Sequence, residues 1–545
     1  MSGFSLVHSR ALLGLRALSV QVEVHLANGL PNFTLVGLAD TEVKEARERV
    51  RSAIANAGLE FPTNKRITVN LAPADIPKDS GRFDLPIALG ILAASGQIDG
   101  SQLAGFEFAG ELSLSGQLRP VQGALAMALG MALQEGELAG RSMPTLVLPE
   151  GSAEEASLVP DAKVVRVAHL LDVVARFAPT QAATQPSDTQ EGQALTSTNT
   201  QPPAFEASSS GWTILQAPEP KATTLSVDMR EVKGQQSAKR ALEIAAAGGH
   251  SVLMVGAPGT GKSMLAQRFA SILPPMNTQE ALESAAILSL AGQFKAAHWA
   301  RRIVQSPHHT ASAVALVGGG SPPRPGEISL AHEGVLFLDE LPEFSRASLE
   351  ALREPLESGQ ISISRATQRA VFPARFQLIG AMNPCPCGYL GSTQKSCRCT
   401  PDQVARYQGK LSGPLLDRID IHVEVQALAP DELLQSAQTA SVSAPPEASA
   451  SIAERVMQAR QRSLERQGTL NRALEGKALE EKICLDEPAR KFLNTAAARL
   501  GWSGRSIHRA LRVARTIADL AGARGVQITH VAEAIQYRRA LKNSA

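Results

Sequence analysis

A glycine-rich loop after an apolar strand is the segment whose residue types point most directly to chemistry. Residues 251–263 read SVLMVGAPGTGKS, and the loop has the spacing of a phosphate-binding P-loop. Its glycines let backbone N–H groups approach phosphate oxygens, and the start of the following helix favours anions. We expect Lys262 to reach the β- and γ-phosphates of ATP and Ser263 to hold Mg²⁺. The loop residues expected around the nucleotide are Gly256, Ala257, Pro258, Gly259, Thr260, Gly261, Lys262 and Ser263.

An acidic pair ends a second apolar strand, in the segment GVLFLDE at residues 334–340. Asp339 stands at the carboxyl end of that strand, where an acidic side chain can bind the water shell of Mg²⁺. Glu340 beside it could polarise the attacking water as a general base. An apolar run that ends in Asp-Glu is common, but after a P-loop in the same α/β segment it indicates nucleotide hydrolysis.

Two further polar side chains flank expected strands of the same segment. The strand FQLIGAMN ends in Asn383, whose amide could orient water between Glu340 and the γ-phosphate. A turn-forming asparagine before Pro384 would give the same pattern. Arg418 lies between two acids just before another strand. It could form a structural ion pair, or it could be an arginine finger, which must come from outside its own P-loop subunit or domain.

Four of the five cysteines lie close together in the sequence. In a reducing compartment, clustered thiols favour a metal over disulfides, and four thiolates can bind Zn²⁺ tetrahedrally. The spacing is C-x-C, nine residues, C-x-C, which is tighter than the usual pair spacing, so inert reduced cysteines fit as well. We expect Cys484, which is isolated, to be buried. The clustered cysteines are Cys385, Cys387, Cys397 and Cys399.

Basic residues gather in two places. Residues 359–376 read GQISISRATQRAVFPARF, which predicts a β-hairpin with Arg365 and Arg369 flanking its turn. From residue 490 to the end, 11 Lys and Arg residues face only two acids, Asp519 and Glu533. Such a surface would bind phosphates without sequence preference, unless part of the charge faces nucleotide and part faces solvent.

The length and composition of the whole chain limit the number of domains and the classes of function that are possible. At 545 residues it suggests three or four domains. A net charge of +2 and only 4% aromatic residues give neither an overall basic field nor a base-stacking platform. An apolar stretch of membrane-spanning length is lacking, and the apolar runs near the N-terminus contain charges. We expect a cytoplasmic protein without a membrane partner.

The elements divide into four segments. Residues 1–177 predict an α/β domain, with a strand at SVQVEVHL, a helix capped at Asp40, and a buried helix at DLPIALGILAASG. The next stretch is rich in Thr, Gln, Ser and Pro and is interpreted as a linker, residues 178–224. Residues 225–427 alternate strands and helices and hold the strong motifs. Residues 428–545 predict a helical domain with a soft insert near 436–451.

Together these motifs resemble a known family. The P-loop, GGGSPPRPGEISLAHEGVLFLDELPEF, AMNPCPCG and SGPLLDRIDIHV are similar to segments of the magnesium-chelatase-like branch of AAA+ ATPases. The resemblance implies an AAA+ core with a helical C-terminal lid, assembled as a hexameric ring with nucleotide between subunits. It also implies roles: Asn383 as the first sensor, Arg418 as a finger acting in trans, and Arg505 as the lid arginine on the γ-phosphate, with Arg509 as the fallback. The hairpin would point into the ring pore and grip DNA.

The N-terminal segment resembles the proteolytic domain of Lon, which uses a Ser–Lys pair. Aligning Pro77-Lys78-Asp79 places Arg82 where the serine should be, and aligning Gly110-Glu111 and Pro120 places Leu125 where the lysine should be. Neither replacement can perform that chemistry. We expect a non-proteolytic α/β domain that serves as an adaptor or guides DNA.

Three functions are compatible with these features. The first is a DNA motor, a helicase that uses ATP and Mg²⁺ for branch migration or strand separation on recombination intermediates, integrating incoming DNA in natural transformation, with recombination proteins as possible partners. The second is a chelatase-type remodeller of a protein partner. The third is an ATP-dependent protease, which the replaced Ser–Lys pair disfavours. The basic hairpin and lid favour the first.

Overall fold

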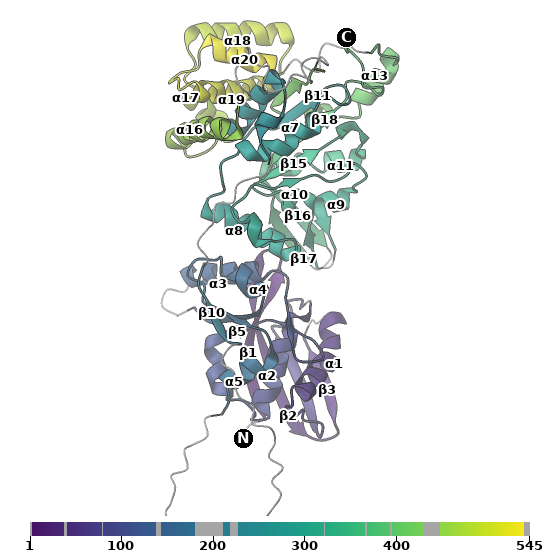
Figure 1. The fold of residues 1–545 in the computed structure, drawn as a ribbon, viewed down its shortest axis with the longest axis vertical. Helices are drawn as coiled ribbons and strands as arrows, with labels where there is room; N and C mark the ends of the chain where they lie inside the picture. Colours follow the sequence, from purple (N-terminus) through teal and green to yellow (C-terminus); the bar gives the residue numbers. More distant parts are fainter. Residues whose placement is uncertain are drawn as a thin grey trace, which may run out of the picture. The chain divides into compact units, whose positions relative to one another are not determined.

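The computed structural model describes most of the chain, in two compact units. These are Met1–Pro220 with Leu288–Ala296, and Lys221–Ile287 with Ala297–Ala545. Both units contain helices and strands, which confirms the expected α/β class (Figure 1). The described residues are 3–37, 41–78, 80–137, 143–179, 211–217, 227–320, 322–365, 368–392, 395–428 and 447–538.

The first unit is built on a mixed sheet of eight strands in the order β10-β9-β8-β5-β1-β2-β4-β3. Val20, Val22 and Val24 of the second strand are fully buried while their neighbours are more exposed, as the alternation predicted. The eight strands are β1 Phe4–Leu13, β2 Arg16–Asn28, β3 Asn32–Val36, β4 Lys65–Ala72, β5 Phe106–Phe108, β8 Thr145–Pro149, β9 Val164–Val167 and β10 Thr213–Leu215. A separate short hairpin pairs β6 Glu111–Leu112 with β7 Leu118–Arg119.

Among the described residues of the first unit, five α-helices accompany the sheet. The expected buried helix is α2, and its first nine residues are all buried because it packs against β1 and β2. The helix expected after Asp40 forms as α1 and ends before Gly58, but its proposed cap, Asp40, lies outside the described residues. The helices are α1 Thr41–Asn56, α2 Asp84–Ala94, α3 Ala124–Glu137, α4 Ser152–Ala156 and α5 Leu170–Arg176, with 3₁₀ turns at Gly81–Phe83 and Gly100–Gly105.

One part of the predicted linker is structured. Within residues 178–224, β10 pairs antiparallel with β9 at the edge of the first sheet. Trp212, just before β10, has its ring centroid 5.7 Å from that of Phe177 and 5.8 Å from that of Phe106, both nearly edge-on. The composition around this strand is mostly polar, so the short strand and its packed Trp212 were not evident from the sequence.

The second unit contains a five-stranded sheet in the order β12-β15-β18-β11-β19, with every neighbouring pair parallel. β15, β18 and β11 are buried at every residue, which is why they read as continuous apolar runs rather than as alternating patterns. The strands are β11 Val252–Val255, β12 Val304–Gln305, β15 Val335–Leu338, β18 Gln377–Met382 and β19 Ile421–Glu424.

Shorter elements surround this sheet. Two hairpins stand apart from it, β13 Gly318–Gly319 with β14 Arg324–Pro325, and β16 Gln360–Arg365 with β17 Gln368–Pro373. The second of these is the hairpin that the sequence predicted. The helices are α6 Gln236–Gly248, α7 Lys262–Phe269, α8 Thr278–Leu290, α9 Ala313–Val317, α10 Glu327–Leu330, α11 Arg346–Glu350, α12 Arg353–Ser358, α13 Pro401–Gln408 and α14 Gly413–Leu416.

The C-terminal segment is helical, as expected, and packs on the sheet of the second unit. Buried side chains of α16 and α19 join one hydrophobic core with α6 and the strands β11 and β19 (Figure 1). The helices are α16 Ser449–Gln467, α17 Gly476–Ile483, α18 Glu487–Leu500, α19 Gly504–Leu520 and α20 Ile528–Gln536.

The structure also bears on the expected burial of Cys484 and on the search for membrane-spanning helices. Cys484, expected to be buried, is exposed, and it follows the end of α17 in the left-handed region with φ of 50°. Among the helices that the structure describes, we find none that combines the length and apolar character needed to cross a bilayer.

Candidate nucleotide site

The P-loop connects the end of β11 to the start of α7. Steric constraints explain why glycine is required at three of its positions. A Cβ at Gly256 would lie 2.3 Å from the carbonyl oxygen of Val425, so only glycine fits there. Gly259 and Gly261 have φ of 78° and 90°, a region that favours glycine. Because β11, β15 and β18 are parallel and adjacent, the residues after their carboxyl ends meet at one edge of the sheet. We call this the carboxyl edge.

Lys262 is turned into its own loop. Its Nζ donates to the carbonyl oxygens of Gly256 at 2.7 Å and Ala257 at 2.9 Å, and it lies 3.3 Å from Oδ1 of Asn383. Burial lowers the pKa of this amine, while the nearby carboxylates of Asp339 and Glu340 act in the opposite direction. The structure therefore brings the P-loop lysine and the expected sensor asparagine into direct contact.

The two expected Mg²⁺ ligands also contact each other. Ser263 Oγ donates to Asp339 Oδ2 at 2.6 Å, although the two residues lie 76 positions apart in the chain. The other oxygen of Asp339 accepts from the backbone N–H of Glu340 at 2.9 Å. A hydroxyl beside a carboxylate is the oxygen-donor pair that Mg²⁺ takes in nucleotide sites. The geometry fits the metal that the P-loop spacing implied.

Glu340 sits at a sharp turn beside this pair. Its φ is 50°, in the left-handed region, and its side chain is 55% exposed. One carboxylate oxygen, Oε2, lies 3.2 Å from Nδ1 of His309. No sequence pattern indicates this contact, because His309 comes 31 positions earlier and belongs to no motif.

Gln235 is a second residue that sequence reasoning missed. It lies in the left-handed region, with φ of 56°, just before α6. Its side-chain Nε2 donates to the carbonyl oxygens of Thr260 at 3.1 Å and Gln426 at 2.7 Å. It therefore ties the P-loop to the segment after β19. An isolated glutamine far upstream carries no recognisable pattern, so only the fold could reveal it.

Arg418 lies at the opposite edge of the same sheet. It precedes β19, and Ile421 at the start of β19 is in register with Val252 at the start of β11, so Arg418 stands at the amino ends of the strands. We call this the amino edge. The guanidinium pairs with Glu357 at 2.5 Å and donates to the carbonyl oxygen of Pro414 at 2.8 Å. The structure does not bring Arg418 to the P-loop of its own chain.

The lid helix α19 also runs along the amino edge. Arg509 pairs with Asp420 at 2.9 Å, and Thr516 Oγ1 lies 2.8 Å from Nε2 of His250, which precedes β11. Arg505 is exposed in the first turn of α19, one turn before Arg509. The fallback residue is thus held in a structural pair, while Arg505 remains on the surface.

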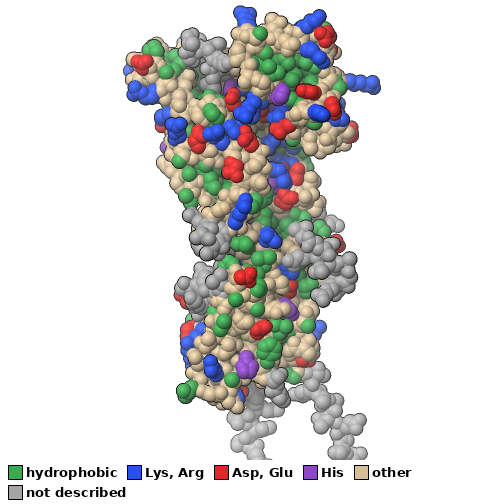
Figure 2. Space-filling model, turned by 180° about the vertical axis from the view of Figure 1, so that it is seen from behind, with side chains coloured by type: hydrophobic (Ala, Val, Ile, Leu, Met, Phe, Trp, Pro, Cys, Tyr) green, Lys and Arg blue, Asp and Glu red, His purple; other side chains and the backbone are tan. Residues whose placement is uncertain are grey.

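The C-terminal segment is less basic on its surface than its composition indicated. Arg515 is fully buried, with its guanidinium 2.8 Å from Asp519, and Arg512 pairs with Glu475 at 3.3 Å. Arg538 is also largely buried, beside the strand end at Ile419 and Asp420. Figure 2 shows acidic and basic side chains intermixed on one face of this unit. Part of the counted charge is structural. Among the described residues from 490 onward, the exposed basic residues are Arg490, Lys491, Arg499, Arg505 and Arg524.

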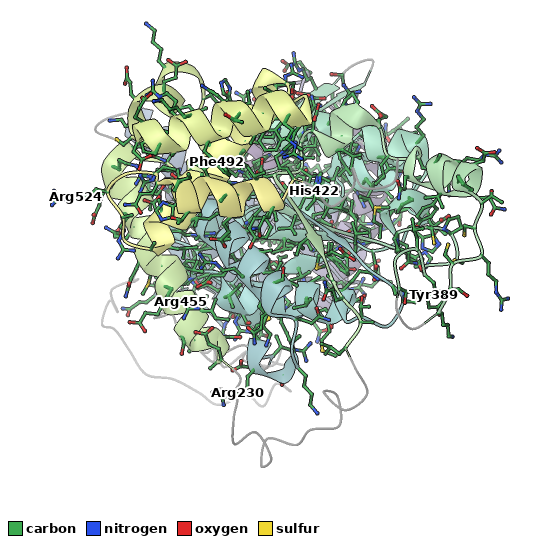
Figure 3. All side chains as sticks on the ribbon, turned by 90° about the horizontal axis from the view of Figure 1, so that it is seen from above. Arg230, Tyr389, His422, Arg455, Phe492 and Arg524 are labelled. Atoms are coloured by element: carbon green, nitrogen blue, oxygen red, sulfur yellow. The ribbon has the colours of Figure 1, made fainter. Side chains whose placement is uncertain are left out.

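The clustered cysteines follow Asn383 directly. Their Sγ atoms all lie within 4.8 Å of one another: Cys385 is 3.4 Å from Cys387 and 3.6 Å from Cys397, and Cys387 is 3.6 Å from Cys397. The fourth member of the group is Cys399. Figure 3 shows Tyr389 of this loop on the side of the unit away from Phe492 of the C-terminal helices.

The cysteine loop also touches the P-loop. A Cβ on Gly388 would lie 2.5 Å from Cδ of Pro258, so the two loops are in close contact. The carbonyl oxygen of Pro384 accepts from Nε2 of Gln408 at 2.9 Å, which ties the loop to α13. The cluster therefore lies beside the nucleotide site.

The arginine hairpin β16–β17 combines buried apolar residues with an exposed arginine. Ile361, Ile363 and Phe372 are buried, whereas Arg369 near the turn is exposed. The side chain of Arg365 lies outside the described residues.

Comparison with known proteins gives consistent matches. Family models described as magnesium chelatase subunit ChlI match residues 228–433 and 22–144, and one for the C-terminal part of that subunit matches 446–538. The chain is 46% identical over 535 residues to the competence protein ComM of Haemophilus influenzae, and 45% identical to the protein YifB of Salmonella typhimurium. Both alignments cover 98% of this chain and 97% of the relative. The magnesium-chelatase 67 kDa subunit of Chlorobaculum parvum is 27% identical over 166 residues, which is 28% of this chain and 23% of that protein.

Proposed function

The chain belongs to the magnesium-chelatase-like AAA+ family that includes ComM and YifB, and from this premise we propose that it is an ATP-driven motor that moves joints in DNA. The observation that carries the proposal is an assembled P-loop site in a chain related along its whole length to a protein named for competence. Competence is the uptake of DNA, so the substrate would be a branched or single-stranded recombination intermediate, with recombination proteins as partners.

ATP hydrolysis is the step for which the site is equipped. Ser263 and Asp339 would hold Mg²⁺, which neutralises charge on the phosphates when bound. Lys262 would exchange its present carbonyl acceptors for phosphate oxygens. Glu340 would accept the proton of the attacking water, and Asn383, already beside Lys262, would orient that water.

Arginines from the amino edge support action between subunits. Arg418 stands at the far end of the strands from its own P-loop, so any phosphate it contacts belongs to another copy of the chain. Arg505 lies one helical turn before Arg509, which is held at the same edge. Both placements favour a closed ring, proposed as a hexamer, in which each chain completes the site of its neighbour.

The N-terminal unit is proposed to be Lon-like and non-proteolytic. Arg82, at the position expected for the serine nucleophile, is buried and donates through Nε to Ser80 Oγ at 2.8 Å. Leu125, at the position expected for the lysine, is buried as well. Neither side chain can act as a nucleophile or base, so the unit would guide DNA or bind a partner.

The cysteine cluster is proposed to hold structural Zn²⁺. A tetrahedral site with Zn–S bonds of about 2.3 Å has S···S edges of about 3.8 Å. Three of the observed separations, 3.4, 3.6 and 3.6 Å, are near that value, whereas a disulfide needs about 2.05 Å. Because Gly388 of this loop meets Pro258, the ion would brace the nucleotide site.

Metal analysis tests this assignment directly. The purified chain should carry about one zinc per subunit, and the Cys387→Ser, Cys397→Ser double variant should carry none. Cys484→Ser removes the exposed cysteine outside the cluster and should retain the metal. Equal zinc in all three proteins would reject the site.

A branch-migration assay tests the main proposal. With ATP, the wild-type chain should dissociate a synthetic four-way junction into duplexes by branch migration. The Lys262→Ala variant should leave the junction intact. The alternative function is a remodeller of a chelatase-type protein partner. If forked DNA neither binds nor accelerates hydrolysis while such a partner does, the alternative replaces the motor.

A further inference from the structure

The surface formed by the cysteine loop and α13 carries positive charge that acidic residues do not balance. From Cys385 to Lys410 the sequence holds four basic residues and a single acid, Asp402. The four exposed basic residues are Lys395, Arg398, Arg406 and Lys410. Lys410 pairs with Glu343 at 3.1 Å, so its charge is compensated. We call the other three residues the loop cations.

The loop cations have no carboxylate partner among the residues that the structure describes. Elsewhere on this unit, Arg353 pairs with Glu350 at 2.5 Å and Arg375 pairs with Glu333 at 2.6 Å, so the charges of those arginines are neutralised within the protein. An unpaired guanidinium keeps its fork of donors for an external acceptor. Phosphates of DNA are acceptors that arginine and lysine bind without regard to base sequence.

The backbone that carries the loop cations is held by local hydrogen bonds. The N–H of Leu390 donates to Sγ of Cys385 at 3.3 Å. At the start of α13, Oγ1 of Thr400 accepts from the N–H of Gln403 at 3.3 Å, and the Gln403 side chain accepts from the N–H of Thr400 at 3.0 Å. This reciprocal cap fixes the first turn of the helix. Because the backbone is held, less entropy is lost when the cations bind a ligand.

Tyr389 adds an aromatic ring to this surface. The ring is partly exposed, and Nζ of Lys395 lies 5.2 Å from its centroid, a cation–π contact that keeps the ammonium beside the ring. Figure 3 shows Tyr389 at the margin of the second unit, and Figure 1 shows α13 away from the helices α16 to α18. Proteins hold single-stranded nucleic acid with this combination, since phosphates bind to the cations and bases stack on the ring.

The same surface is joined to the nucleotide site. Gly388, next to Tyr389, is in close contact with Pro258 of the P-loop. In the last turn of α13, Nε2 of Gln408 donates to the carbonyl oxygen of Pro384 at 2.9 Å, and Pro384 directly follows Asn383. A strand bound to the loop cations would therefore be held by the loop that contacts the P-loop.

We propose that Lys395, Arg398 and Arg406 form a second contact surface for the DNA backbone, separate from the hairpin β16–β17. The identity of the ligand rests on the proposed DNA motor, whereas the unpaired charge is a feature of the structure itself. The surface binds a single strand through its phosphates, with Tyr389 against a base, and has little preference for sequence.

The test measures binding of a fluorescent single-stranded oligonucleotide to the full chain by anisotropy, with a non-hydrolysable ATP analogue and over a range of salt. The Lys395→Gln, Arg398→Gln, Arg406→Gln triple variant should bind about tenfold to 100-fold more weakly at about 0.1 M salt. The slope of log affinity against log salt should become shallower by about 2, because each phosphate contact on a single strand contributes about 0.7. ATP hydrolysis without DNA should be unchanged.

A matched triple variant is the control for the lost charge. Lys477→Gln, Arg490→Gln, Arg499→Gln also removes one lysine and two arginines, all exposed, from α17 and α18. It should keep the wild-type affinity and slope. If the loop variant unfolds at a lower urea concentration than the wild type, the Lys395→Gln, Arg406→Gln double variant takes its place, with a slope change of about 1.4.

The outcomes separate this inference from the motor. Wild-type affinity in the loop variant, or an equal loss in the control, overturns the inference, and the motor stands if the wild-type chain binds the strand. If the wild-type chain binds no oligonucleotide at any salt, DNA is rejected as the ligand together with the motor. If the loop variant fails to assemble with other copies in light scattering, the surface contacts another subunit and the inference is rejected.

Discussion

The two edges of the sheet in the second unit carry similar charged residues but differ in how far these residues are exposed to solvent. At the carboxyl edge, Lys262, Asp339 and Glu340 are mutually close, and Glu340 is largely exposed. At the amino edge, Asp420 and His250 are 6% and 0% exposed and form a hydrogen-bonded pair of 3.2 Å. The carboxyl edge holds charged groups that a ligand can still reach, whereas the amino edge encloses its charges.

The difference shows that residue type alone does not separate a reactive group from a structural one. Asp339 directly follows the buried strand β15, whereas Asp420 directly precedes β19. Because these strands belong to one parallel sheet, the two acids lie at opposite edges. Asp420 is surrounded by His250 and Arg509, so its charge is compensated within the protein. The acids of the carboxyl edge lie beside a lysine whose present acceptors are mostly backbone carbonyls.

Removing the lysine of the carboxyl edge should have the largest effect. Lys262→Ala deletes the group expected on the β- and γ-phosphates, so nucleotide affinity should fall by about 100-fold or more and turnover should be lost. A fluorescent ATP analogue measures the binding. Lys477→Ala, an exposed lysine on α17, serves as the control. Retained ATP affinity in Lys262→Ala would contradict the assignment of the loop.

In the proposed ring, Arg418 would connect the two edges across neighbouring copies of the chain. Arg418→Ala should leave nucleotide affinity within about twofold and reduce turnover about 10³-fold, the lower range for an arginine finger. Glu357→Gln removes the present partner of Arg418 and should cost little. Equal losses in the two variants would indicate a purely structural ion pair.

Mixing experiments sharpen the same comparison. Subunits with Arg418→Ala and subunits with Glu340→Gln should recover part of the activity when combined, because some mixed interfaces contain one intact residue of each kind. No recovery at any mixing ratio would count against action between subunits.

The amino edge should respond in stability rather than in chemistry. Asp420→Ala leaves His250 and Arg509 without their carboxylate, and breaking a buried pair costs about 3–5 kcal/mol. We expect a lower midpoint of urea unfolding for the second unit. Nucleotide affinity, measured in the remaining folded protein, should be close to that of the wild type. A large loss of affinity with unchanged unfolding would reverse the roles of the two edges.

The smallest expected effect is a pH dependence of that stability. Burial by itself would raise the pKa of Asp420, but the hydrogen bond and charge of His250 and the charge of Arg509 lower it below its ordinary value of 3.8. A lowered pKa in the folded state stabilises the protein above the ordinary value, and that stabilisation is lost as the pH falls through the folded value. The difference in unfolding midpoint between wild type and Asp420→Asn should therefore narrow below about pH 4. A gap that stays constant down to pH 3 would be inconsistent with an ionised Asp420.

Much of the nucleotide site could be predicted because its residues follow apolar strands and a rigid loop. The P-loop, Asp339 and Asn383 each come directly after a buried strand, and parallel strands bring their carboxyl ends together. The local periodicity of apolar residues also predicted the hairpin and the C-terminal helices. The roles assigned to Arg418 and Arg505 and the zinc remain predictions.

The remaining features depend on contacts between distant segments. His309 and Gln235 have no motif, and the strand β10 lies within a stretch whose composition predicted a linker. The buried arginines of the lid look like surface charge in the sequence, because only packing shows that Asp519 neutralises Arg515.

The amino-acid sequence by itself determined the P-loop and the buried strands, since glycine spacing and apolar runs act over a few residues. Only the tertiary structure decided which charged groups face a ligand and which face one another. That choice depends on strand order and helix packing, which place residues such as His309 and Glu340 together from separate parts of the chain.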